Sequence, residues 1–332
     1  MRYCSSFFSR SFFKKNLMMH DLNGVGENLI VNLYRSKNGL RPVSRLLGMA
    51  TLSVLLSACS PRYFIVQGIG DELASQSKAA EDDVVLAREA SAFYLKLSES
   101  VLRQSPDNLK LAEAVAGGFT QYAYAFVSFE AERIETKDVK AAQKLRERAA
   151  RLYLRAHHHA MAALEQHKPG FAKALSSSEP ANWPRLDDDE IGLAYWAAAS
   201  WGGFISLSKD DPNIVADLPL AIRLAHLAWK KYPSYGDGAL ASLMGSFETA
   251  RSGGSHQQAL VYFDQAIAAS AGKSAGPFVA KAEGIALPAG ERPAFEALLR
   301  QAIVASDARH DLQNAVMRER ALWLLTTADD LF

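Results

Sequence analysis

Cysteine is nearly absent from this chain of 332 residues, in which only Cys4 and Cys59 occur. A fold stapled by several disulfides is therefore excluded. Charge of one sign is also lacking, because 37 Lys and Arg stand against 36 Asp and Glu. A nucleic-acid-binding protein needs a basic face that displaces counterions, so this balance argues against a nucleic-acid partner.

Reactive motifs are missing too. Beyond residue 58 the sequence has neither a Gly-x-Ser-x-Gly elbow nor a His-Glu-x-x-His pair. The run His157–His159 cannot converge on one metal ion, since successive helical side chains point ~100° apart. The run Asp187–Glu190 lacks the alternating ligands of a calcium loop and instead suits the start of a helix. Carboxylate pairs such as Glu130 and Glu132 show no sign of confinement. We therefore expect no catalytic residue, no metal and no cofactor, and an enzyme is disfavoured.

Long hydrophobic runs are scarce. The run Leu46–Leu56 follows Arg41 and Arg45 and is ~11 residues long, which is too short to cross a bilayer of ~30 Å. A cationic end, an apolar core and small residues form the order of a secretory signal. The sequence Leu-Ser-Ala-Cys that ends at Cys59 matches the bacterial lipobox and predicts lipidation of this thiol. A buried cysteine after an apolar helix is the alternative interpretation.

Three regions follow from this interpretation. Residues 1–58 are a signal peptide and a leader that is removed, with the true start placed at Met18 or Met19 as an alternative. Residues 59–80 are a lipidated tether, and residues 81–332 are the folded domain, with a net charge of −5 beyond residue 58. The tether begins with Ser60 instead of the aspartate that retains lipoproteins in the inner membrane, so we expect the outer membrane. Residues 62–66 fit either a short strand or a packed N-terminal arm.

The folded domain shows no convincing strand-like alternation, and its apolar residues recur at helical intervals. Residues 168–187 are rich in Pro and Ser and are expected to be irregular. The pattern predicts an all-α domain with helices over 82–105, 109–134, 137–166, 191–208, 217–231, 236–251, 256–270, 275–286, 294–305 and 312–328.

Residues 191–208 contain no charged side chain. Their length reaches the lower limit for a membrane span, but six of them are Gly or Ser. We favour a helix that other helices surround on every side. Gly202 and Gly203 would allow neighbouring helices to approach closely.

A repeat emerges from the spacing of small and large residues. A small residue, a large one a turn later and another small one form a surface suited to close helix packing. This pattern resembles the second helix of the tetratricopeptide repeat (TPR) and predicts a TPR-like array, an α-α superhelix with degenerate repeats. The copies are Ala149/Tyr153/Ala156, Ala221/Ala225/Ala228, Ala259/Phe263/Ala266 and the weaker Phe295/Leu299/Ala302.

Aromatic residues are the best candidates for a functional surface. They are Tyr195, Trp196, Trp201 and Phe204 on the uncharged helix, and Tyr232 and Tyr235 at a junction between helices. One interpretation places all of them in the core. The other is a concave groove that binds an apolar segment or a small ligand.

Several blocks together resemble the TatT family, the T-component lipoproteins of TRAP transporters. The blocks are Tyr195–Gly202, Asp217–Pro219, Tyr232–Tyr235, Ala259/Phe263/Ala266 and Asp329–Phe332.

This resemblance implies an all-helical, TPR-like periplasmic lipoprotein. It would bind the solute-binding component of a TRAP transporter and help hand over a small organic ligand. Self-association into a homo-oligomer stays open. The alternative function is an outer-membrane TPR lipoprotein that acts as an assembly or structural scaffold without a role in transport.

Overall fold

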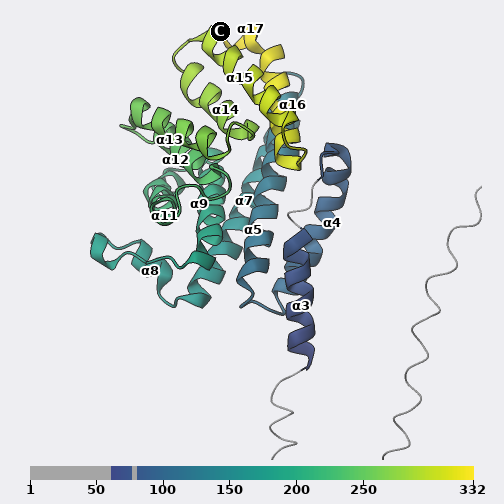
Figure 1. The fold of residues 1–332 in the computed structure, drawn as a ribbon, viewed down its shortest axis with the longest axis vertical. Coiled ribbons are helices and arrows are strands. Elements are labelled where there is room, and N and C mark those ends of the chain that lie inside the picture. The colour runs from purple at the N-terminus through teal and green to yellow at the C-terminus, as the bar shows by residue number, and fades with distance from the viewer. Residues whose placement is uncertain (1–60, 77–80) are drawn as a thin grey trace, which may run out of the picture. The chain divides into compact units, whose positions relative to one another are not determined.

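The computed structural model describes residues 61–76 and 81–332, so the predicted signal peptide and Cys59 lie outside the described part. Every regular element in these ranges is helical, which confirms the all-α prediction (Figure 1). The longer helices are α3 (Pro61–Gln76), α4 (Val84–Leu102), α5 (Leu109–Tyr122), α7 (Val139–His167), α9 (Ile191–Ser206), α11 (Leu218–Lys231), α12 (Ala239–Ala250), α13 (His256–Ala269), α15 (Arg292–Asp307) and α16 (Leu312–Thr326). The shorter ones are α6 (Phe129–Ile134), α8 (Phe171–Leu175), α10 (Pro212–Val215), α14 (Ala275–Lys281) and α17 (Ala328–Leu331).

Helix α3 occupies most of the stretch predicted as a tether. It packs against α4 and α5, and its Leu73 and Ala74 are buried. The side-chain amide of Asn108, at the start of α5, donates hydrogen bonds to Gln67 at 2.8 Å and to Asp71 at 3.1 Å. The chain here is thus a packed helical arm and not a strand.

The start of α5 shows how short polar residues set the helix boundaries. The Asn108 side chain accepts a hydrogen bond from the Leu111 amide at 2.9 Å and so caps a free end of the helix. Asp83, Asp138, Ser255 and Asp311 cap α4, α7, α13 and α16 in the same way. The expected helices therefore agree with the observed ones to within a few residues.

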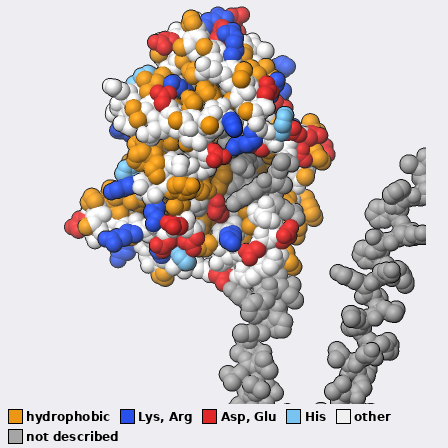
Figure 2. Space-filling model, in the orientation of Figure 1, with side chains coloured by type: hydrophobic (Ala, Val, Ile, Leu, Met, Phe, Trp, Pro, Cys, Tyr) orange, Lys and Arg blue, Asp and Glu red, His pale blue; other side chains and the backbone are white. Residues whose placement is uncertain are grey.

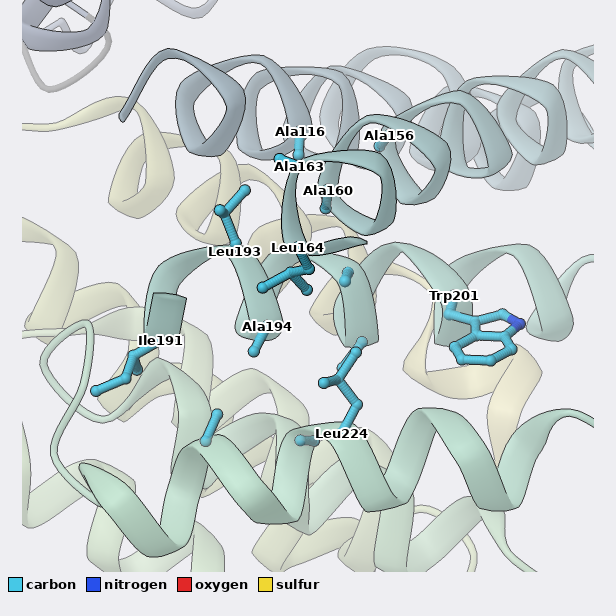
Figure 3. Close-up of a cluster of buried hydrophobic side chains, with 14 of the residues drawn as sticks. Ala116, Ala156, Ala160, Ala163, Leu164, Ile191, Leu193, Ala194, Trp201 and Leu224 are labelled. Carbon is cyan, nitrogen blue, oxygen red and sulfur yellow. The ribbon is translucent and has the colours of Figure 1, made fainter. Parts of the chain in front are cut away.

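Helix α9 lies between α5 and α7 on one side and α11 on the other (Figure 3). Its Leu193 and Ala194 and the Leu224 side chain of α11 are fully buried in one hydrophobic cluster. A methyl group added at Gly202 would lie 2.7 Å from the Phe247 ring, and one at Gly203 would lie 2.8 Å from the Tyr153 ring. The prediction of close approach at these glycines is confirmed. Other helices cover much of α9, but Tyr195 and Trp196 stay partly exposed, so the helix is not surrounded on every side.

The repeated small-large-small positions are all in the core. Each copy lies on one helix, namely α7, α11, α13 or α15, and its members are 0–5% exposed. The large residue Phe263 of α13 packs so tightly on α12 that a methyl group at Gly245 would lie 2.7 Å from its ring. The pattern therefore marks helix–helix packing, and neighbouring helices α11 to α16 contact one another in sequence order.

Two π-helical segments interrupt this regular packing. Residues Ala123–Ser128 form η2 between α5 and α6, and residues Ala282–Ala286 form η5 after α14. Such wider turns are rare and are frequently found at functional sites. In the described ranges no helix combines the length and the apolar character that crossing a membrane requires.

Candidate functional site

Four of the six predicted groove residues come together beside the N-terminal half of α9. The Tyr195 ring lies 4.6 Å from Trp196 and 5.4 Å from Tyr235, between ring centroids. Tyr232 lies 6.3 Å from Tyr235 and is 50% exposed. We call Tyr195, Trp196, Tyr232 and Tyr235 the aromatic face. It joins α9 to the turn between α11 and α12.

A carboxylate from α5 anchors this face. The Tyr235 hydroxyl donates a hydrogen bond to Glu113 at 2.8 Å. Helix α9 can approach Glu113 because residue 192 is glycine. A methyl group on Gly192 would lie only 2.2 Å from the Glu113 carboxylate. Burial, followed by the charge of Glu113, raises the pKa of Tyr235, and burial raises the pKa of Tyr195 to about 12. Both hydroxyls therefore stay protonated at neutral pH, and that of Tyr235 donates its hydrogen bond to Glu113.

The other two predicted groove residues lie elsewhere. Trp201 is buried in the core, 4.4 Å from the His157 ring. Phe204 packs into a separate cluster around Tyr153 of α7. Successive residues of α9 point in different directions, so one helix cannot present all of its aromatic side chains on one surface.

The three consecutive histidines have three different roles. His157 is buried and hydrogen-bonds the Ala197 carbonyl at 3.1 Å, and burial lowers its pKa to about 4. His158 is exposed. His159 hydrogen-bonds Glu99 of α4 at 2.9 Å. The run is therefore not one solvated face, and the three side chains do not meet.

The acidic run Asp187–Glu190 starts α9 through a capping box, in which Asp187 and Glu190 each accept a backbone hydrogen bond from the other. Atoms of His167, Asp187 and Glu190 lie within 4.8 Å of one another, as metal ligands would. However, the Lys168 ammonium lies 2.6 Å from Glu190 and 2.8 Å from Asp187. A side-chain cation thus already pairs with both carboxylates, so this cluster has a structural role: it connects the end of α7 to the start of α9.

Sequence reasoning missed a buried cation at the two π-helical segments. Arg320 of α16 is 7% exposed and forms two hydrogen bonds with Glu283 of η5, at 2.6 and 3.0 Å. It forms a third with Glu132 of α6 at 2.9 Å. Glu132, which seemed unconfined from the sequence, is therefore held in a partly buried charge cluster. Burial raises the pKa of Glu132, and Arg320 only partly offsets that effect.

Aromatic rings surround this guanidinium. It lies 5.2 Å from the centre of Phe129, 5.6 Å from Tyr124 and 5.9 Å from Trp323, which favours a cation over the ring faces. Tyr124 belongs to η2, so both wide turns supply a group to Arg320. Its Nη1 is buried and has no hydrogen-bond partner among the described residues. The cluster joins the C-terminal helices to α5–α7.

Comparison with known proteins assigns the family. A family model for the TRAP transporter T-component matches residues 80–332. The chain belongs to this family. The T-component is also similar to an uncharacterised protein of Treponema pallidum (strain Nichols), with 24% identity over 262 residues that cover 76% of this chain and 81% of that protein. The match begins beyond α3, so the packed arm lies outside it.

Family membership gives this protein a role in TRAP transport and suggests a membrane-associated or periplasmic location. T-components are transporter parts and are not known as an enzyme family.

On the face drawn in Figure 2, basic and acidic side chains are interspersed, and hydrophobic side chains gather across the middle.

Proposed function

We propose that this T-component is a periplasmic lipoprotein, anchored through Cys59, that binds the solute-binding component of a TRAP transporter and helps hand over a small organic ligand. Its helices form a TPR-like array, and the aromatic face is its docking surface. The alternative, an outer-membrane assembly scaffold without a transport role, accounts for the helical repeats but not for the family match.

The observation that carries the docking proposal is the half-buried state of the aromatic face. Tyr195, Trp196 and Tyr235 are packed on one side and open on the other, and Tyr232 is 50% exposed at the rim. Tyr and Trp are enriched at protein interfaces because they combine a large apolar area with a polar tip. The hydrogen bond between Tyr235 and Glu113 fixes the face before a partner arrives, which lowers the entropic cost of binding.

Affinity capture of the tagged full-length protein from detergent-solubilised envelopes tests this function. We expect to recover a TRAP solute-binding protein. Tyr232→Ala should weaken that recovery about tenfold or more, as is typical for an aromatic hot spot of an interface. Phe93→Ala is the matched control, because Phe93 is an exposed aromatic residue on α4, outside the aromatic face.

Capture of cell-wall or outer-membrane assembly proteins without a solute-binding protein would support the alternative scaffold. Mass spectrometry of the mature N-terminus tests the anchor separately. An unmodified thiol at Cys59 would rule out lipidation without bearing on docking.

A further inference from the structure

One carboxylate oxygen at the start of α9 is buried without a partner. Glu190 is fully buried, and its Oε2 accepts hydrogen bonds from the Lys168 ammonium at 2.6 Å and from the Asp187 amide at 2.7 Å. Its Oε1 has no hydrogen-bond partner among the described residues. A buried carboxylate oxygen in this state costs free energy, because it has lost its hydration and gained no contact in exchange. A cation or a further donor beside Oε1 would remove that cost.

The end of α7 brings a metal-binding group to this oxygen. His167 is the last residue of α7, and its Nε2 lies 3.9 Å from Oε1 of Glu190, which is too far for a hydrogen bond. A carboxylate oxygen of Asp187 completes a set of three ligand atoms that all lie within 4.8 Å of one another. The set combines one imidazole nitrogen with two carboxylate oxygens, and both kinds of atom are common ligands of zinc.

The spacing of these atoms suits a single ion after a small adjustment. Two ligands that bind a tetrahedral zinc ion at about 2.1 Å lie about 3.4 Å apart, so the observed 3.9 Å is about half an ångström too long. The side chains of His167 and Asp187 are 40% and 64% exposed, so both can move toward the ion. Lys168 holds Glu190 through Oε2 and also donates to the Arg185 carbonyl at 2.6 Å, which leaves Oε1 available.

The acidic run at this point keeps an excess of negative charge. Residues Asp187–Glu190 carry four carboxylates. Lys168 pairs with the first and the last of them, and Lys231 pairs with Asp188. These two lysines are the permanent cations that form ion pairs with the run in the described ranges, so four negative charges meet two positive ones. The remaining two negative charges attract a divalent cation.

We propose that His167, Asp187 and Glu190 bind a divalent transition-metal ion, for which zinc fits the ligands best. The imidazole disfavours calcium and magnesium, which prefer oxygen ligands. Water completes the coordination of the ion, since the chain supplies three ligands. The ion joins the end of α7 to the start of α9 more firmly than Lys168 does alone. It thereby fixes the helix that carries Tyr195 and Trp196 of the aromatic face.

This inference goes beyond what the sequence led us to expect. Neither the His157–His159 run nor the acidic run can supply a ligand set alone, and only the fold brings His167 to the acidic run. The site is separate from the aromatic face, and metal binding requires neither the lipid anchor nor a TRAP partner. Its test uses the purified protein alone, so its failure differs from a failure to capture the solute-binding component.

Isothermal titration of zinc into the purified full-length protein, freed of metal with a chelator, is the direct test. We expect one site that prefers zinc to calcium. His167→Gln should weaken zinc binding at this site by more than roughly 100-fold, because even the partners of metal ligands contribute roughly 10–100-fold. Asp187→Asn should also weaken it through loss of a charged ligand. Both variants should fold, because the two side chains are exposed and Asn caps a helix as well as Asp does.

His158→Gln is the matched control, since it removes an exposed imidazole from the same helix. This variant should bind zinc as the unaltered protein does. Cys4 and Cys59 are present in every variant, so zinc bound by a thiol does not affect the comparison.

Thermal unfolding gives a second measurement. Zinc should raise the unfolding temperature of the unaltered protein and of His158→Gln, but not of His167→Gln, because the three ligands meet only in the folded state. The proposal is overturned if the unaltered protein binds zinc no more tightly than His167→Gln does. Equal binding of calcium, or unchanged zinc binding in Asp187→Asn, also overturns it.

Discussion

Arg320 and Glu132 lie 188 positions apart in the sequence, yet their side chains meet at 2.9 Å in a partly buried cluster. Glu283 completes the cluster with two further hydrogen bonds to the same guanidinium. A single cation therefore connects α6, η5 and α16. Such a contact is weak evidence for net stability, but removing Arg320 leaves two partly buried carboxylates without their shared cation.

Replacement of this cation should be costly. We expect Arg320→Ala to lower the free energy of unfolding by about 2–4 kcal/mol, because Glu132 and Glu283 lose their shared partner. Urea unfolding monitored by circular dichroism measures the change. The exposed ion pair of Arg300 and Glu296 gives the comparison, and Arg300→Ala should change stability by less than about 0.5 kcal/mol. Equal effects for the two variants would contradict the central role of Arg320.

Close packing at α9 predicts a second effect. Gly203→Ala should destabilise the protein by about 1–2 kcal/mol, because the new methyl group would lie 2.8 Å from the buried Tyr153 ring. Gly276→Ala in α14 is the control, since no neighbouring atom there comes closer than 3.7 Å. Better helix propensity should make that change neutral or stabilising by up to about 1 kcal/mol. Thermal unfolding distinguishes the two outcomes, and a stabilising Gly203→Ala would argue against close contact.

Glu99 should make the protein sensitive to strong acid. Burial alone would raise the pKa of Glu99, but hydrogen bonds from Arg155, Lys96 and His159 outweigh it and lower the pKa to about 2. A carboxyl with a lowered pKa contributes stability above its unfolded pKa of 4.5, and this contribution is lost as pH falls towards 2. The loss should be about 3 kcal/mol at most.

Unfolding free energies measured across this pH range, where the protein remains folded, test the assignment. Glu99→Gln should reduce the change of the unfolding free energy with pH below pH 4.5. Replacement of the exposed Glu319 by Gln should leave it unchanged. If Glu99→Gln left the pH dependence of the unfolding free energy unchanged, other carboxyl groups would be its cause.

His157 should act in a higher pH window. Burial lowers its pKa from 6.5 to about 4, so the folded state holds the neutral ring. Its contribution to stability is complete above pH 6.5 and is lost as pH falls towards 4, by about 3 kcal/mol at most. His157→Gln, which can still donate to the Ala197 carbonyl, should remove this part of the pH dependence. The adjacent exposed His158→Gln should not, and NMR titration of the two imidazoles reports the pKa values directly.

Local sequence signals were sufficient to predict most helices. Asn108 and Pro233 mark boundaries because a cap or a missing amide acts within one turn. The alanine-rich repeats predicted helix packing, since small residues at one-turn spacing fit only against another helix. The wide turns η2 and η5 could not be predicted, because helical spacing continues through both segments.

The candidate sites were less predictable, because they depend on contacts between distant segments. The aromatic composition of α9 indicated Tyr195 and Trp201 alike as candidates. Only the way in which α5 and α7 pack on α9 shows that Tyr195 is half-buried and Trp201 is buried. Arg320 lies in a helix of mixed apolar and charged residues, and no local pattern distinguishes it from the partly exposed Arg318.

Helix α16 is synthesised after the segments that hold Glu132 and Glu283, and it carries the guanidinium that both carboxylates require. Until α16 leaves the ribosome, the two carboxylates have no shared cation, and the rings of Tyr124 and Phe129 lack their contact with Arg320. A chain cut short before residue 320 would therefore contain the earlier helices but not the guanidinium that pairs with both carboxylates. Such a chain would expose these groups and become a substrate for chaperones and proteases.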